Sequence, residues 1–175
     1  MSDHPVVPDA KLFSSFPTAQ PYPTEDDAYQ GHLLEQYKVY VAMADKISDR
    51  RQAANSYFLA VNSALLAFLG YAIPKGSTEY LWLVGLAGMT LSYLWYRIVR
   101  SYRDLNSAKF LVIQQIETRL PLQSFQAEWV AVGEGKNPSL YKPVTHVEMG
   151  VPWVFFVLHA FVVLKTFPWH AIAVR

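Results

Sequence analysis

The side chains of this 175-residue chain that are best suited to binding a metal ion or moving a proton are its histidines. No two of them are four residues apart, the spacing that lets two imidazoles on one helix face hold the same metal ion. Cysteine is absent, which excludes disulfides, thiolate catalysis and cysteine metal sites. We therefore predict no metal site and no cofactor. The histidines are His4, His32, His146, His159 and His170.

A second candidate for chemistry is the fragment at residues 133–136 (GEGK), which has the glycines and lysine of a phosphate-binding loop. A P-loop needs GxxxxGK[ST] directly after a strand. Here Asn137 replaces the hydroxyl residue and the surroundings are helical, so a plain loop is favoured. No nucleophile–base pair, acid pair or oxyanion hole stands out elsewhere. We predict that the chain is not an enzyme, and its net charge of +1 argues against nucleic-acid binding.

Several polar or small residues lie inside long apolar runs. In a membrane, an amide such as Asn62 or an imidazole such as His159 requires a partner on a neighbouring helix. For His159 the alternatives are a proton or ion path and a neutral hydrogen-bonded histidine, and the second is favoured. Small residues let helices approach closely. The residues predicted to pack helices within the membrane are Asn62, Gly85, Gly88, Ser92 and His159.

The densest groups of charge flank two of these apolar runs. If the flanking helices pair, Asp45 or Asp49 can meet Arg100, Arg103 or Lys109. We predict inter-helix salt bridges and contacts with anionic lipid headgroups; a site for a small anion is the alternative. The residues concerned are Asp45, Lys46, Asp49, Arg50, Arg51, Arg97, Arg100, Arg103, Asp104 and Lys109.

The apolar runs themselves predict three transmembrane helices, at residues 57–73, 80–96 and 151–167. A bilayer requires about 20 mainly apolar residues, within a range of about 17–25. Trp and Tyr at the ends of the runs are typical of the membrane interface. A buried hairpin in a soluble protein is the alternative for the first two runs. A re-entrant or interfacial helix is the alternative for the third.

Basic residues are concentrated before the first run and after the second, whereas the intervening turn has only Lys75. This asymmetry predicts a cytoplasmic N-terminus and, if the third run spans, a periplasmic C-terminus in a bacterial inner membrane.

The remaining elements are also predicted to be helical, so the fold class is all-α. Apolar residues recur three and four apart in residues 28–56 and 97–120. These segments therefore extend the first two spans into a cytoplasmic helical stalk. One more short helix is predicted at residues 125–132 (FQAEWVAV). A Pro-rich extended or disordered arm is predicted at residues 1–27, followed by a single helical membrane domain at 28–175.

Particular segments resemble a known family. They are residues 37–51 (YKVYVAMADKISDRR), 54–56 (ANS) and 101–110 (SYRDLNSAKF), with Leu120-Pro121 and Glu128-Trp129. They resemble the RipA-type family of small octameric bacterial membrane proteins. The resemblance implies a homo-octamer in the inner membrane and supplies no catalytic residues.

The function predicted from these features is a homo-oligomeric inner-membrane scaffold whose partners are other copies of itself and membrane lipids. The alternative is an oligomeric channel or membrane-perturbing effector. A polar axis near Asn62 or His159 would favour the channel, whereas an apolar or lipid-filled axis would favour the scaffold.

Overall fold

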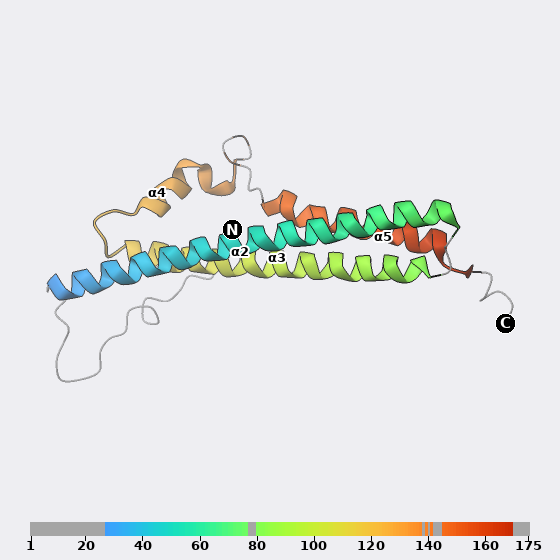
Figure 1. The fold of residues 1–175 in the computed structure, drawn as a ribbon. Helices are drawn as coiled ribbons and strands as arrows, with labels where there is room; N and C mark the ends of the chain where they lie inside the picture. The colour runs from blue at the N-terminus through green and yellow to red at the C-terminus, as the bar shows by residue number, and fades with distance from the viewer. Residues whose placement is uncertain (1–26, 77–79, 138, 140, 142–144, 170–175) are drawn as a thin grey trace. The chain divides into compact units, whose positions relative to one another are not determined.

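The computed structural model describes residues 27–76, 80–137, 139, 141 and 145–169, and these are almost entirely helical (Figure 1). No strand occurs in this part of the chain, so the all-α prediction is confirmed. The predicted arm lies outside the described residues except for its last position. The elements are α2 (Asp27–Ala72), η1 (Ile73–Lys75), α3 (Leu81–Glu117), α4 (Ser124–Ala131), η2 (Gly133–Gly135) and α5 (Thr145–Thr166).

Helix α2 runs without interruption for 46 residues. It has no proline, and its two glycines, Gly31 and Gly70, lie near its ends. Pro74 then follows in the 3-10 turn η1, where its ring is compatible with the first positions of a helix. Gly76 closes the turn at φ 77° and donates its N–H to the carbonyl of Ile73. This left-handed conformation suits glycine because it has no Cβ.

Helix α3 ends at Glu117, which is earlier than the predicted end at residue 120. The amides of Arg119 and Leu120 each donate to a carbonyl three residues back, at 3.0 Å. The last α-helical turn is thereby replaced by a tighter one. Pro121 explains this, because the residue before a proline avoids the α conformation.

Helix α5 begins at Thr145, six residues before the predicted start of the third apolar run at residue 151. The prediction placed the start at the first long apolar stretch, but the helix also includes Glu148 in its first turn. A carboxylate there interacts favourably with the helix dipole. The buried Pro152 lies inside the helix and does not end it.

The described helices contribute to two compact units. One, the α4 unit, contains residues up to Ser48 and Asp104–Pro143, and therefore α4 with parts of α2 and α3. The other, the α5 unit, contains Asp49–Arg103 and the residues from Val144 onward, and therefore α5 with the remaining parts of α2 and α3.

The α5 unit is a three-helix bundle in which α2, α3 and α5 lie side by side (Figure 1). Trp95 of α3 lies at the centre of one core cluster. Its ring stacks on Phe58 of α2, with 6.1 Å between centroids, and lies 5.9 Å from the ring of Phe155 of α5. A second cluster lies nearer to η1, with Leu69, Ala72 and Leu81 buried at its centre.

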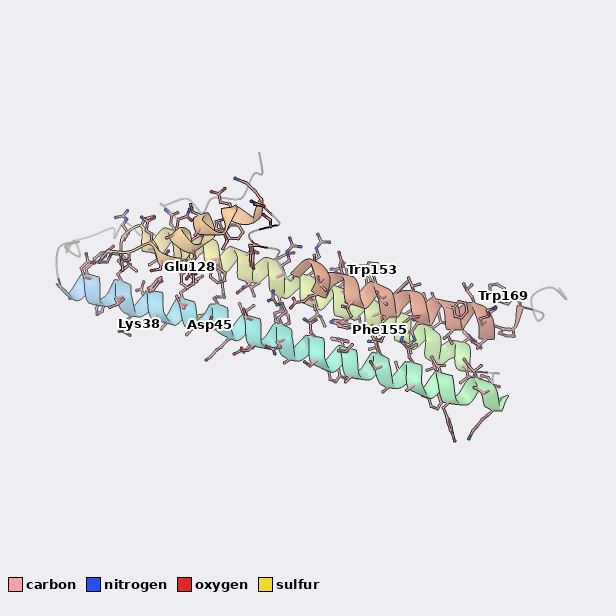
Figure 2. The ribbon with its side chains drawn as sticks, turned by 90° about the horizontal axis from the view of Figure 1, so that it is seen from above. Lys38, Asp45, Glu128, Trp153, Phe155 and Trp169 are labelled. Atoms are coloured by element: carbon pink, nitrogen blue, oxygen red, sulfur yellow. The ribbon has the colours of Figure 1, made fainter. Side chains whose placement is uncertain are left out.

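The α4 unit has a smaller core between α2 and α3. Its buried apolar residues are Leu33, Ala44, Ile47, Ile113 and Ile116. Helix α4 is attached through Phe125, whose ring meets Phe110 of α3 edge to face at 5.4 Å. Lys38, Asp45 and Glu128 mark α2 and α4 of this unit in Figure 2, and all three are exposed.

Candidate functional site

The α5 unit buries polar side chains and exposes apolar ones. Asn62, Ser92 and His159 are all at most 1% exposed. A water-soluble protein tends toward the opposite distribution, with charged and amide side chains outside. The large apolar side chains exposed on its helices include Tyr57, Leu59, Phe68, Tyr71, Leu83, Leu86, Leu94, Val154, Val157, Leu158, Phe161 and Leu164.

Asn62 and Ser92 join α2 to α3. The Ser92 hydroxyl is 3.0 Å from Asn62 Oδ1 and 2.8 Å from the carbonyl oxygen of Gly88. The Asn62 amide nitrogen donates to the carbonyl of Phe58 at 2.8 Å. The amide predicted to need a neighbouring helix therefore has its partner within the same chain.

His159 packs against the glycines of α3. A Cβ atom at Gly88 would overlap the imidazole ring of His159. A Cβ atom at Gly85 would lie 2.7 Å from Val163 Cγ2 and 3.3 Å from the carbonyl oxygen of His159. Both ring nitrogens of His159 are buried, with no hydrogen-bond partner among the described residues. The small residues thus allow α5 to approach α3 closely enough to enclose the imidazole.

Polar contacts continue at the end of the bundle where the charged residues begin. Trp95 Nε1 donates to Asn55 Oδ1 at 2.8 Å, which links α3 to α2. Arg51 Nε lies 3.5 Å from Glu148 Oε2, which links α2 to α5. Arg103 Nη1 lies 3.4 Å from the Met149 sulfur atom. Helix α5 is therefore held at its start by arginines from both other helices.

The other predicted charged residues lie mainly on the outside of their helices. Arg97 and Arg100 are exposed, and their Nη1 atoms each lie 3.2 Å from a tyrosine hydroxyl one turn earlier, those of Tyr93 and Tyr96. Lys109 differs, because it is buried and its ammonium lies 4.5 Å from the centre of the Tyr40 ring. The exposed remainder is Asp45, Lys46, Asp49, Arg50 and Asp104.

A carboxylate that the sequence did not single out holds the α4 unit together. Glu117 is fully buried at the end of α3. Its Oε1 atom accepts from the Tyr37 hydroxyl at 2.9 Å and from the amide of Phe125 at 3.2 Å, and Oε2 accepts from the amide of Gln126 at 3.4 Å. These amides belong to the first turn of α4, whose N–H groups have no partner within the helix.

This contact also changes the acidity of Tyr37. Burial, together with the hydrogen bond to Glu117 and the charge of that carboxylate, raises the pKa of Tyr37 to about 12. The phenol therefore stays protonated and keeps donating over a wide pH range.

The 133–136 fragment forms a turn of its own. Gly133, Glu134 and Gly135 all have positive φ angles. Lys136 pairs with Glu134 beside it, which lowers the pKa of that carboxyl. Because the lysine is directed to its own loop, this geometry gives no support to phosphate binding. Among the described residues, no group of three or more His, Asp or Glu side chains is placed to hold a metal ion.

Two segments of the described chain are long and apolar enough to cross a membrane: Ala28–Lys75 and Val147–Thr166. The first contains the predicted span at residues 57–73, and the second contains residues 151–166 of the predicted span at 151–167. The second predicted span, at residues 80–96, is not one of these two segments. Its Trp, Tyr, Gly and Ser residues lower its mean hydropathy.

Residues 34–168 match the model of the Octameric membrane protein family (8xMP). The chain belongs to this family. The resemblance to a family of octameric membrane proteins is thereby confirmed, and the chain is a membrane protein. The 8xMP name also supports homo-oligomerisation, whereas the narrower RipA-type assignment stays a prediction. No curated protein and no solved structure matches this 8xMP chain.

Proposed function

We propose that the chain is a homo-oligomeric scaffold of the bacterial inner membrane, without catalytic activity, that assembles from eight copies. The 8xMP match supports the copy number. The single observation that carries the scaffold is a set of large apolar side chains exposed on the α4 unit, among exposed charged residues. This set is Leu34, Val39, Met43, Leu105, Leu122, Trp129 and Val130.

Charged side chains such as Lys38 and Asp45 make the α4 unit suited to water rather than lipid. Exposed apolar side chains are unfavourable there, and two of them on one helix face favour an interface. Val39 and Met43 lie one turn apart on α2 and are 57% and 44% exposed. Another copy of the same chain is the partner that the 8xMP name supports.

Three spans are part of the proposal, with the N-terminus in the cytoplasm. Residues 81–96 of α3 contain no charged side chain. Ser92 in this segment bonds to Asn62 of α2, and Gly88 encloses His159 of α5. Helices α2 and α5 are long and apolar enough to cross a membrane. Because residues 81–96 of α3 contact both of them, these contacts support a position for α3 at the same depth in the membrane.

The channel alternative gains no support from Asn62 or His159. Both are fully buried within one chain. Neither side chain can therefore line a pore between copies while the bundle keeps this packing.

The scaffold is tested by placing a charge in the exposed apolar set. Val39→Glu should lower the copy number of the detergent-purified protein, measured by light scattering after size-exclusion chromatography. Lys38→Gln is the matched control, because it changes the net charge by the same amount on an adjacent exposed position of α2. If Val39→Glu keeps the copy number of the unmodified chain, this surface does not join the copies.

The topology is tested with tags at the two ends of the chain. Three crossings place the ends on opposite sides of the membrane, and two crossings place them on the same side. Protease accessibility in inverted vesicles distinguishes the two. Both tags on one side would contradict the three-span topology.

A further inference from the structure

One exposed surface of the α5 unit combines arginines with aromatic rings. Tyr93 and Arg97 are four residues apart on α3, as are Tyr96 and Arg100, so the four side chains share one helix face. Trp153 of α5 adjoins them, with its ring 5.3 Å from that of Tyr96. We call these five residues the Tyr–Arg surface. Figure 2 shows Trp153 on the first part of α5.

Two internal contacts hold the guanidinium groups in place. Arg97 Nη1 lies 3.2 Å from the Tyr93 hydroxyl, and Arg100 Nη1 lies 3.2 Å from the Tyr96 hydroxyl. Tyrosine is neutral, so the hydrogen bond to Tyr93 orients Arg97 without cancelling its charge. The planar guanidinium fork matches the oxygens of a phosphate group.

The position along α3 places this surface at the boundary of the apolar segment. Residues 81–96 carry no charge, and Arg97 is the first charged residue after them. No acidic residue occurs in α3 before Asp104. Tyr and Trp prefer the headgroup level of a bilayer. Leu86, 41% exposed, lies about two turns deeper on the same face, where an acyl chain would run.

We infer that the Tyr–Arg surface binds the phosphodiester headgroup of an anionic phospholipid, with Arg97 as its main ligand. A lipid fits better than a free anion because charged and apolar side chains occur on one face in the order of headgroup and acyl chain. The inference rests on the proposed three-span topology, in which α3 crosses the membrane, and the tag experiment tests that topology separately.

The test is lipid binding to the full chain in neutral detergent, followed by native mass spectrometry during titration. The probes are phosphatidylglycerol, phosphatidylcholine and inorganic phosphate. The unmodified chain should retain phosphatidylglycerol in preference to phosphatidylcholine, and phosphate should not displace it. Arg97→Gln should weaken phosphatidylglycerol binding about fivefold, given the usual contribution of one basic residue at a membrane surface.

Arg50→Gln is the matched control. Arg50 is an exposed arginine on α2 beside Arg51, which pairs with the start of α5, and the substitution removes the same charge. If the Tyr–Arg surface is a specific lipid site, Arg50→Gln should weaken phosphatidylglycerol binding much less than Arg97→Gln does. Equal losses would mean diffuse attraction to the charged end of the bundle and would overturn the inference. So would displacement of the lipid by inorganic phosphate.

Two further variants keep the test informative. Tyr93→Phe keeps the ring but removes the hydroxyl that orients Arg97, and should weaken binding about twofold or more, within the range of one lost hydrogen bond. Arg97→Lys keeps the charge without the fork and should fall between the unmodified chain and Arg97→Gln; it replaces Arg97→Gln if that variant fails to fold. A changed copy number with unchanged lipid retention would assign the surface to a contact between copies and overturn the inference.

Discussion

The imidazole of His159 lies directly against Gly88, at a point on α3 where a Cβ atom would overlap the ring. The ring of His159 on α5 thus occupies the space that a side chain at Gly88 of α3 would fill. One turn further along α3, Ser92 bonds to Asn62. Buried polar groups therefore lie at the contacts of α3 with both α2 and α5, and the stability of the unit depends on this packing.

Gly88→Ala should destabilise the protein by about 1–3 kcal/mol, the usual range for an overpacked core. Gly70→Ala is the control, because its added Cβ meets nothing within 4 Å and alanine favours a helix. Thermal unfolding in detergent is the measurement. His159→Ala should make Gly88→Ala tolerable by removing the ring. Equal melting temperatures for the two glycine variants would show that α3 and α5 are not in close contact.

Asn62→Leu should reduce stability by about 0.6–2 kcal/mol, because a hydrogen bond between membrane helices is lost. The copy number should stay the same, since the partner Ser92 belongs to the same chain. In a double-mutant cycle with Ser92→Ala, read by thermal unfolding, the double variant should be less destabilised than the sum of the two single variants, because both remove the same hydrogen bond. A normal melting temperature with a reduced copy number would instead place the amide between subunits.

Glu117→Ala should detach the first turn of α4. The amides of Phe125 and Gln126 lose a buried acceptor, which costs about 1–3 kcal/mol. Hydrogen exchange at these two amides should accelerate. Glu117→Gln keeps one oxygen acceptor and should have a smaller effect, while Glu128→Ala, at an exposed position on α4, is the control. Unchanged exchange in Glu117→Ala would refute the capping role.

The stability of the α4 unit should fall at alkaline pH because of Tyr37. Its folded pKa of about 12 lies above the ordinary value of 10.0, so the folded state binds the phenol proton more tightly. The resulting stabilisation is fully present below about pH 10 and is lost as the pH rises through about 12. Tyrosinate absorbance of the unmodified chain minus that of Tyr37→Phe should isolate this late titration. Glu117→Gln should move it to lower pH, and a difference titration near 10 in the unmodified chain would contradict the contact.

Arg51→Gln and Glu148→Gln should each destabilise the bundle by about 1 kcal/mol, because each leaves one half-buried charge without its partner. The exchanged pair Arg51→Glu with Glu148→Arg should recover only part of the loss, since a cation is unfavourable in the first turn of α5. Chemical unfolding of the single and double variants measures the coupling. Strictly additive effects would show that the two groups do not interact.

How far the sequence predicted this structure depends on the range of the interactions involved. Helix α2 was predictable because no proline interrupts it, which is a local property. The early end of α3 follows from a local turn before Pro121, but the extra residues at the start of α5 mix polar and apolar types and do not form a continuous apolar run. The buried role of Glu117 depends on Tyr37, 80 residues away, and no local pattern indicates that pairing.

For the polar residues of the membrane helices, too, local features were predictable and long-range partners were not. Asn62 and His159 were recognisable as groups that need a protein environment, because lipid offers them no partner. Whether that environment is the same chain or a neighbour depends on the packing of α2, α3 and α5. For Arg51, the partner Glu148 was missed because the charge pattern pointed to the helix next in sequence, whereas the contact is with α5.

The central claim is that this 8xMP chain assembles with copies of itself. Native mass spectrometry of the full-length protein, released from membranes in mild detergent, measures the copy number most directly. We predict a complex of eight copies of the 19.9 kDa chain. A single copy as the dominant species in detergent that preserves the helical fold would contradict the claim.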